Sequence, residues 1–237
     1  QNGTKIEVKD AQEIDLAYGN VESIDLLNWQ DVMDGMVIGD GMVHKASNNK
    51  VVLIIGDNDY DYFEYKSISS LITKERSGIS NKAWEVKTTI TADELPHTYE
   101  RTVPDRFFYG DKYVVAGFLK GLFTANGCVN GYGKRIELKQ TSLKLIRQVQ
   151  QMLSSLGIRS YITTTKETRV VHKNGEYVSK KSYALSISVD RYKFAKLVGF
   201  VQDYKTFAVT GETAAAKNTY EINKVTNLGK MPVYDIT

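Results

Sequence analysis

The sequence predicts an α+β fold built from two copies of one unit, and three observations support this. Residues 111–200 have the periodicity of a helix, two strands, a helix, two strands and a helix. Residues 29–110 repeat this order less cleanly. The first helix of each copy ends on similar stretches, MDGMVIGDG at 33–41 and LKGLFTANG at 119–127. We therefore expect two pseudo-symmetric repeats rather than one irregular domain.

The elements of the second copy follow from caps, apolar spacing and turn residues. Asp111 and Ser142 are helix N-caps placed before runs with apolar residues at helical spacing. The Asn174-Gly175 pair predicts a tight turn between two strands. The expected elements are a helix at 111–125, two short strands within 127–141, a helix ending at Gly157, strands in 158–171 and 177–189, and a short helix ending at Gly199.

The first copy is predicted by the same signals. Alternating apolar residues and the Asn48-Asn49 pair indicate a pair of strands after the first helix. Pro96 and Pro104 mark a connector, residues 91–110, between the copies. The expected elements are helices in 28–40 and 61–72 and strands in 42–47, 50–56, 74–80 and 83–90.

Composition excludes several classes of protein. A hydrophobic share of 42% and a charged share of 25% are ordinary for a globular domain. No apolar run reaches the roughly 20 residues of a membrane span, and no leader opens the chain, so we expect a cytoplasmic protein without a membrane partner. Cys128 stands alone, and the three histidines lack zinc-ligand spacing. A net charge of +3 does not by itself indicate a nucleic-acid partner.

Small residues recur every four positions on the first helix of each copy, which favours close helix packing. They are Gly35 and Gly39 in one copy and Gly117, Gly121 and Ala125 in the other. If the helices pack about a pseudo-twofold axis, Asp40 and Asn126 become neighbours. Close carboxylates at such a junction are tolerated mainly around a divalent cation. Either ending alone also fits an ordinary helix C-terminus, but the matched pair favours a functional site.

The two stretches MDGMVIGDG and LKGLFTANG resemble the signature helices of the LAGLIDADG homing endonucleases, and the repeats resemble that family's αββαββα fold. The resemblance implies a monomer that cleaves both strands of a long double-stranded DNA site with Mg²⁺ or Mn²⁺. By position the metal ligands are Asp40 and Asn126. Because an amide brings no charge and accepts no proton, we expect weaker metal binding and impaired cleavage. Asn126 fits either natural decay or deliberate replacement.

The resemblance also implies that solvent-facing strand residues read the major groove and that a lysine lies near the metal. Lys139 and Lys87 are the catalytic candidates by strand position. Residues 180–189 alternate apolar with small polar side chains, as a half-solvated strand does. The DNA-contact candidates are Arg135, Lys139, Gln140, Arg159, Lys166, Arg169, Lys180, Ser182 and Ser186 in the second copy and Lys45 and Lys82 in the first.

The chain ends resemble parts of an intein. Residues 4–20 resemble the splicing-domain stretch before an inserted endonuclease, and 231–237 resemble the stretch where the splicing domain resumes. The chain opens on Gln1 and closes without a His-Asn pair, so splicing by this chain alone is not expected. The expected domains are splicing-domain-like (Hint) remnants at 1–28 and 201–237, the first repeat with its connector at 29–110, and the second repeat at 111–200.

Three alternatives remain open on the sequence. They are a DNA-binding protein of the same fold without nuclease activity, an RNA maturase, and an α+β interaction module that binds no nucleic acid. The sequence does not disclose the DNA target or the host protein.

Overall fold

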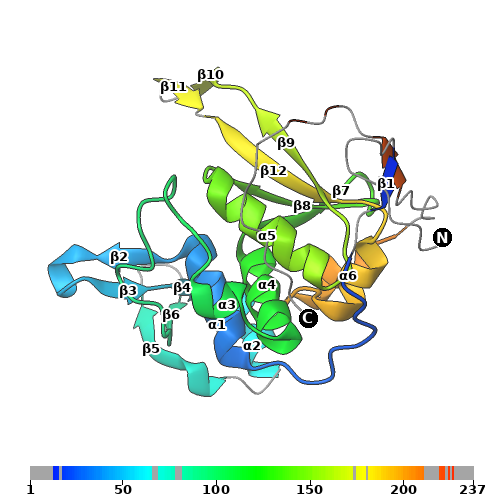
Figure 1. Cartoon of the computed structure of the whole chain (residues 1–237). Coiled ribbons are helices and arrows are strands. Elements are labelled where there is room, and N and C mark those ends of the chain that lie inside the picture. The colour runs from blue at the N-terminus through cyan, green and yellow to red at the C-terminus, as the bar shows by residue number, and fades with distance from the viewer. Residues whose placement is uncertain are drawn as a thin grey trace. The chain divides into compact units, whose positions relative to one another are not determined.

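The computed structural model describes residues 13–15, 18–65, 69–77, 82–172, 175–179, 181–210, 219–221, 224 and 226 (Figure 1). The chain divides into two compact units, residues 1–17 with 215–237, and residues 18–214. In the first unit, β1 (Glu13–Asp15) pairs antiparallel with β13 (Thr219–Glu221). The domain boundaries that the sequence suggests at 28, 110 and 200 stay predictions.

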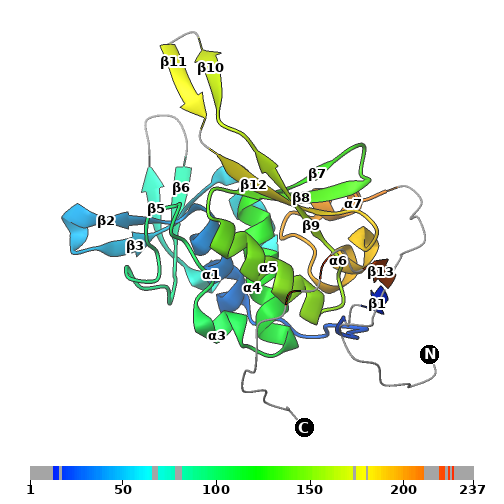
Figure 2. The same ribbon diagram turned by 45° about the horizontal axis from the view of Figure 1, so that its top comes forward.

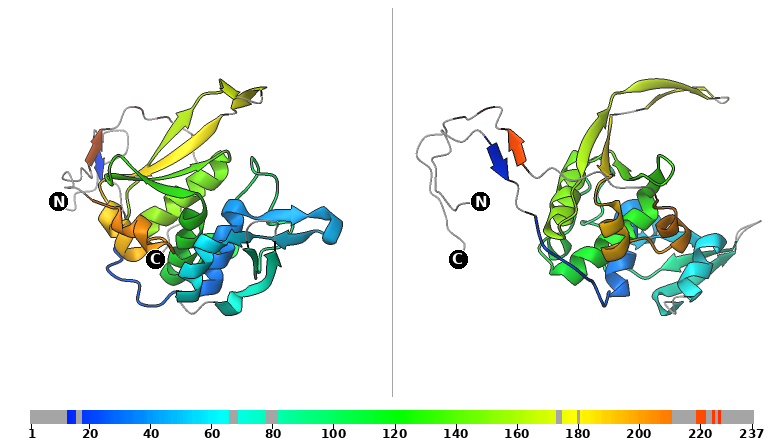
Figure 3. Two further views of the ribbon diagram at one scale, coloured as in Figure 1. Left: turned by 180° about the vertical axis from the view of Figure 1, so that it is seen from behind. Right: turned by 90° about the vertical axis from the view of Figure 1, so that its right-hand side faces the viewer.

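Two helices, α1 (Trp29–Asp40) and α4 (Lys112–Asn126), pack against each other at the centre of the second unit (Figures 1 and 3). The Asn28 side chain caps α1 by accepting from the Gln30 amide, and the Asp111 side chain caps α4 by accepting from the amides of Tyr113 and Val114 in its first turn. Every residue of α1 from Val32 to Gly39 is buried. Both predicted signature helices are therefore confirmed, and Asp111 is the predicted cap.

Two glycines let these helices approach until backbone meets backbone. A Cβ at Gly35 would lie 2.1 Å from the carbonyl oxygen of Phe118, and a Cβ at Gly121 would lie 1.8 Å from that of Val32. Gly35 and Gly121 are as far apart in the chain as Val32 and Phe118, so each contact is the twofold mate of the other. The small-residue stripe therefore serves the close crossing that the sequence predicted.

The second repeat contains a four-stranded antiparallel sheet in the order β7-β8-β12-β9. One face carries buried apolar residues such as Leu138 and Leu185, which are directly opposite each other. Helix α5 packs against β8 and β12, and helix α6 follows the last strand. The elements are β7 (Gly127–Asn130), β8 (Arg135–Gln140), α5 (Leu143–Ser155), β9 (Tyr161–Thr165), β12 (Ser182–Ile187) and α6 (Arg191–Leu197).

A separate hairpin, β10 (Thr168–His172) with β11 (Gly175–Ser179), projects beyond this sheet (Figure 2). The sequence predicted two long strands, 158–171 and 177–189, and each of them is split in two. The outer halves pair only with each other, whereas the inner halves join the sheet. Val171 and Val178 of this hairpin are exposed, so these two side chains are not buried in the core of the sheet.

The first repeat has the same strand order in a less regular form. Its sheets are β2-β3 and β4-β6-β5, and Leu53 interrupts what the sequence predicted as one strand, 50–56. The Leu53 carbonyl still accepts from the Val86 amide, so β3 and β4 together take the place of β8. The elements are β2 (Met42–His44), η2 (Lys45–Ser47), β3 (Lys50–Val52), β4 (Ile54–Gly56), α2 (Asp57–Tyr65), η3 (Ser69–Leu71), β5 (Ile72–Ser77) and β6 (Lys82–Val86).

The helix predicted at 61–72 begins earlier, at Asp57, and ends at Tyr65. Residues 66–68 lie outside the described part of the chain. Gly157 and Gly199 end α5 and α6 with φ of 75° and 61°, as predicted for helix C-termini. Two short helices, α3 (Asp105–Phe108) and α7 (Asp203–Phe207), precede α4 and follow α6. None of the helices that the structure describes has the length and apolarity of a membrane span.

Candidate functional site

Asp40 and Asn126 lie side by side at the C-terminal ends of α1 and α4, although 86 residues separate them in the chain. Nδ2 of Asn126 donates to Oδ1 of Asp40 at 2.6 Å. Nε2 of Gln140 in turn donates to Oδ1 of Asn126 at 2.7 Å. The contact that the sequence predicted from the pseudo-twofold axis is therefore present. Asn126 is the middle residue of a polar chain that joins Asp40, Asn126 and Gln140.

Gly39 makes room for this contact. A Cβ at Gly39 would lie 2.6 Å from Oδ1 of Asn126 and 2.7 Å from the Cβ of Ala125. Any larger residue would push the helix ends apart at the point where the two polar side chains meet. The last small residue of the stripe thus serves the site directly.

The pair opens into a cavity of about 550 Å³. Asp40 is exposed, whereas Gln140 is only 9% exposed, so the polar chain runs from the cavity into the protein. Lys139 lines the same cavity, as the catalytic prediction for it requires. The remaining lining comes from Gly39, Thr98, Tyr99, Gln140, Thr141, Val178 and Ser182.

Arg101 covers the C-terminal end of α1. Nη1 donates to the carbonyl oxygens of Ile38 and Gly39, the former at 2.8 Å, and Nη2 donates to that of Gly41 at 2.7 Å. The residue is 7% exposed, and burial lowers the pKa of its guanidinium while the nearby Asp40 charge opposes that shift. A buried cation at this position neutralises the negative end of the helix dipole.

Lys205, in α7, does the same at the end of α4. Its ammonium donates to the carbonyl oxygens of Thr124 at 3.0 Å and Gly127 at 3.4 Å. These oxygens are the twofold mates of those of Ile38 and Gly41. Burial lowers the pKa of Lys205, opposed by charges that include Asp40. Two cations that do not correspond in sequence therefore cap corresponding carbonyls beside the Asp40–Asn126 pair.

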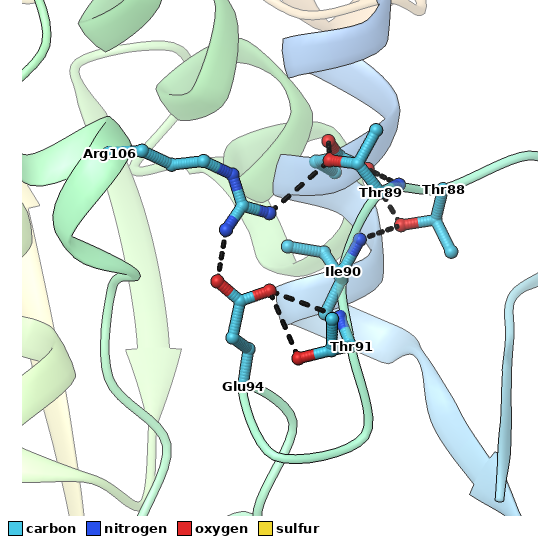
Figure 4. A network of polar contacts seen from close by, with 7 residues as sticks. Thr88, Thr89, Ile90, Thr91, Glu94 and Arg106 are labelled. Carbon is cyan, nitrogen blue, oxygen red and sulfur yellow. Dashed lines mark hydrogen bonds and ion pairs between the residues drawn. The ribbon is translucent and has the colours of Figure 1, made fainter.

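The connector that carries Arg101 is fixed to α1 by a polar network (Figure 4). Oδ1 of the buried Asp34 accepts from the Thr88 hydroxyl at 2.6 Å and from the Thr89 amide at 2.8 Å. Arg106 donates to the Thr89 hydroxyl and pairs with Glu94. Burial alone would raise the pKa of Glu94, but the hydrogen bonds and charge of Arg106 and the Thr91 amide bring it below its ordinary value.

Three residues lie where they do not serve the roles that the sequence predicted for them, near the metal for Lys87 and at the DNA for Gln140 and Arg159. Lys87 does not line the cavity of Asp40; its ammonium donates to the Ser70 carbonyl, and it lines a separate cavity with Gln30. Gln140 shares a face with Leu138, so it is turned inward to Asn126 rather than toward solvent. Arg159 makes a fork of hydrogen bonds to Asp190 and is therefore committed to holding α6 in place.

The other DNA-contact candidates divide by exposure. Lys166 and Arg169 are exposed on β9–β10, and Lys45 is exposed beside a third cavity. Ser182 lines the central cavity, whereas Ser186 is buried and donates to Glu137. The Lys82 side chain and the whole of Lys180 lie outside the described residues.

Sequence reasoning missed Arg101 and Lys205. Both lie outside the repeated αββαββα pattern, one in the connector and the other after the second repeat, and they differ in type and spacing. A basic residue in an irregular segment carries no periodic signal, so only the fold shows which carbonyls it meets.

The fold and this junction agree with the arrangement that the sequence resemblance implied. Two glycine-faced helices cross and end on a shared polar pair, and each is followed by strands in the same order. Residues 113–199, which span most of the second repeat, match the model of the family described as "LAGLIDADG-like domain". The expectation of an α+β fold with two repeats is confirmed.

Curated relatives are similar over most of this chain. The replication factor C small subunit of Methanocaldococcus jannaschii is 25% identical, covering 70% of this chain and 11% of its own length. The probable translation initiation factor IF-2 of the same organism is 27% identical, covering 80% of this chain and 17% of its own length. The ribonucleoside-diphosphate reductase NrdEB subunit alpha of Bacillus subtilis is 26% identical, covering 100% of this chain and 25% of its own length. The chain thus spans a quarter or less of each.

Solved structures with similar folds include the homing endonuclease I-DmoI. A structure of its mesophilic variants is 20% identical with a TM-score of 0.45, covering 72% of this chain and 94% of that one. The N-terminal LAGLIDADG domain of DUF199/WhiA is 10% identical with a TM-score of 0.40, covering 80% and 87%.

Proposed function

We propose that this chain is a LAGLIDADG-type endonuclease that binds a long duplex DNA site and whose cleavage is impaired by Asn126. The observation that carries the proposal is the pairing of Asp40 and Asn126 where two twofold-related helices end in one cavity. Because one chain supplies both helices, a monomer is complete. Phosphodiester hydrolysis at such a junction requires groups that hold a cation and orient a water molecule.

The residues present fit one divalent cation weakly. Carboxylate and amide oxygens suit Mg²⁺ or Mn²⁺, and Asp40 and Asn126 would hold the ion. Among the described residues no cluster of three or more His, Cys, Asp or Glu side chains could do so. Relatives of this fold support a divalent ion, since I-DmoI was solved in complex with DNA and Ca or Mn. When bound, such an ion acidifies a coordinated water and stabilises charge on the phosphate.

Asn126 lowers the activity of this site for two reasons. Its Nδ2 donates to Asp40, so the amide places a nitrogen where a second oxygen ligand would complete the site. It also brings no negative charge and takes no proton from an attacking water. We expect the DNA strand served by this half to be cut slowly or not at all.

The test is cleavage of a cognate site by Asn126→Asp and by the unchanged chain. A site selected from a randomised duplex library is incubated with Mg²⁺ or Mn²⁺, and nicked and fully cut products are resolved on gels. Asn126→Asp should raise cleavage by orders of magnitude, and Asp40→Asn in that background should remove it. Equal rates for the two forms would exclude Asn126 from the chemistry.

A catalytically inactive DNA-binding protein is the second candidate. The hydrogen bond between Asn126 and Asp40 favours it, because the pair satisfies itself without a cation. This candidate predicts salt-dependent binding to duplex DNA with no cleavage by the unchanged chain at any divalent concentration. An RNA maturase would instead bind structured RNA in preference to duplex DNA, and an interaction module would show no salt-dependent binding to duplex DNA.

We further propose that the chain belongs to an intein. The relatives are replication, translation and nucleotide-reduction proteins, and a shared segment of about this chain's length in such unrelated proteins is typical of an inserted element. Both terminal segments lie in one compact unit, where β1 pairs with β13. The gene sequence on both sides tests this. A Cys or Ser upstream and a His-Asn pair downstream are expected, and uninterrupted unrelated coding sequence would contradict it.

A further inference from the structure

We infer that Arg135 reads a guanine in the DNA major groove and that Glu137 is the positioning residue that holds it. This inference rests on the proposed DNA-binding function and names a specificity-determining contact within it. Four polar side chains form a cluster on one face of the second repeat's sheet: Asn130, Arg135, Glu137 and Ser186.

The register of the sheet places this cluster on a single face. Arg135 and Glu137 are two residues apart on β8, so both point to the same side. Asn130 on β7 is opposite Arg135, and Ser186 on β12 is opposite Glu137. The opposite face is the core, where Leu138 is fully buried. The cluster therefore spans three neighbouring strands on the face away from the core.

The Glu137 carboxylate is held at the base of the cluster from three sides. Its Oε2 accepts from Nδ2 of Asn130, and its Oε1 accepts from the Ser186 hydroxyl at 3.3 Å. Nε of Arg135 lies 2.7 Å from Oε1, a close ion pair although the N–H does not point at the oxygen. Ser186 is 1% exposed and the Glu137 side chain is 20% exposed, so the carboxylate lies low on the face.

Arg135 lies above this carboxylate with its outer edge available. Its side chain is 43% exposed although Nε is buried, so the exposure belongs to the other side-chain atoms. A guanidinium whose Nε side is paired with a carboxylate leaves Nη1 and Nη2 to act as a planar pair of donors. That pair matches O6 and N7 of guanine, the commonest specific contact in the major groove. A phosphate contact would not need the carboxylate, which repels phosphate.

Arg159 shows what the alternative, a purely structural arginine, looks like in this fold. Both its Nε and its Nη2 donate to Asp190, and its side chain is only 23% exposed. The whole fork is used within the protein. Arg135 uses one edge internally and keeps the other for a ligand.

The experiment measures the affinity of the full chain for its selected site and for every single-base-pair variant of it. The proteins are the unchanged chain, Arg135→Ala, Arg135→Lys, Glu137→Gln and Arg135→Ala with Glu137→Gln. Lys144→Ala, at an exposed position of α5, is the control. An unfolding transition is recorded for each protein so that loss of fold is recognised.

Arg135→Ala and Arg135→Lys should both lose about 5- to 150-fold discrimination at one G·C pair while the other positions keep theirs. Lysine fails because it keeps the charge but loses the fork. Glu137→Gln should lose part of the same discrimination and leave affinity for unrelated DNA equal or higher. In the Arg135→Ala background it should have no further effect at that pair, because Glu137 acts through Arg135.

Three results would overturn the inference. Uniform weakening by Arg135→Ala with rescue by Arg135→Lys would indicate a phosphate contact. A change of base preference by Glu137→Gln in the Arg135→Ala background would show that the carboxylate itself reads a base. Absence of salt-dependent duplex binding by the unchanged chain would instead refute the proposed function, and the inference with it.

Discussion

At the scale of single residues, the Asp40–Asn126 contact is a charge-assisted hydrogen bond in which only one partner carries charge. Asn126→Asp replaces the donor with a second carboxylate at the same distance. Without a divalent cation we expect the folded state to lose about 2 kcal/mol, from the lost bond and the new repulsion. With Mg²⁺ or Ca²⁺ the loss should be reversed, since a ligand that binds only the folded state stabilises it.

Thermal unfolding of both forms in EDTA and in millimolar Mg²⁺ measures this. The unchanged chain should show a small response to the metal, and Asn126→Asp a large one. If Asn126→Asp were as stable as the unchanged chain in EDTA and did not respond to metal, the two side chains would not share a cation.

The capping cations give a second prediction at this scale. Arg101→Met should lower the free energy of unfolding by about 2–3 kcal/mol, because it leaves three carbonyl oxygens without a donor. Lys205→Met should cost less, about 1–2 kcal/mol, because it leaves two longer bonds unmade. Urea denaturation measures both, and Lys144→Met serves as the surface control. If neither variant changed the free energy of unfolding, water would be taking the place of the lost donors at these carbonyl oxygens.

The sequence predicted Asp40, Asn126 and Lys139 for the central cavity, and the structure places all three there. These residues were recognisable because a repeated motif and strand position carry them. Arg101 and Lys205 have neither. Lys87 was misplaced because it follows β6, which takes the place of β12, whereas Lys139 lies on β8. Gln140 was predicted to face solvent, but it lies two residues after Leu138 on β8, and the alternation of side chains along the strand puts both on the inward face.

At the scale of elements, the crossing of α1 and α4 depends on particular glycines rather than on glycine content. Gly121→Ala puts a Cβ 1.8 Å from the Val32 carbonyl oxygen and forces two backbones apart, at a cost of about 3 kcal/mol or more. Gly117→Ala on the same helix comes no closer than 3.2 Å, the distance to the Asp31 Cβ, and then 3.5 Å from the Asn28 carbonyl oxygen. It gains up to about 1 kcal/mol of helix propensity, so we expect a near-neutral change.

Chemical denaturation of the two variants compares them directly. Gly121→Ala should also reduce DNA cleavage in the Asn126→Asp background, because it separates the helix ends. Similar stabilities for Gly117→Ala and Gly121→Ala would contradict the backbone contact.

Element order was predictable because caps, helical spacing and turn glycines are local signals, and Asp111, Ser142, Gly157 and Gly199 act as predicted. The interruption at Leu53 and the separation of β10–β11 from the sheet were not. Both depend on which strand finds a partner across the sheet, and that is decided by packing between segments distant in sequence.

At the scale of the whole molecule, stability should fall as the solution becomes acidic. Burial alone would raise the pKa of Asp190, but the hydrogen bonds and charge of Arg159 lower it below its ordinary value. A carboxylate with a lowered folded-state pKa contributes stability that is present above the unfolded-state value, roughly 4, and is lost as pH falls through the folded-state value. Glu94 acts in the same direction.

Asp190→Asn should therefore reduce stability at pH 7 by about 2 kcal/mol and make the acid side of the stability profile less steep. Urea midpoints between pH 2 and pH 7 measure both effects. An unchanged slope below pH 5 would show that the Arg159–Asp190 pair contributes nothing to the linkage.

The two ends that meet at the cavity are related by a twofold axis but are chemically different, with Asp40 and Arg101 on one side and Asn126 and Lys205 on the other. Perfect symmetry in a protein is mirrored by palindromic operators, and a single chain with unlike halves is released from that constraint. Under the proposed function, the DNA sequence that this chain prefers can lack a palindrome altogether. The chain would then bind in only one orientation, with a fixed assignment of the reactive half to one strand.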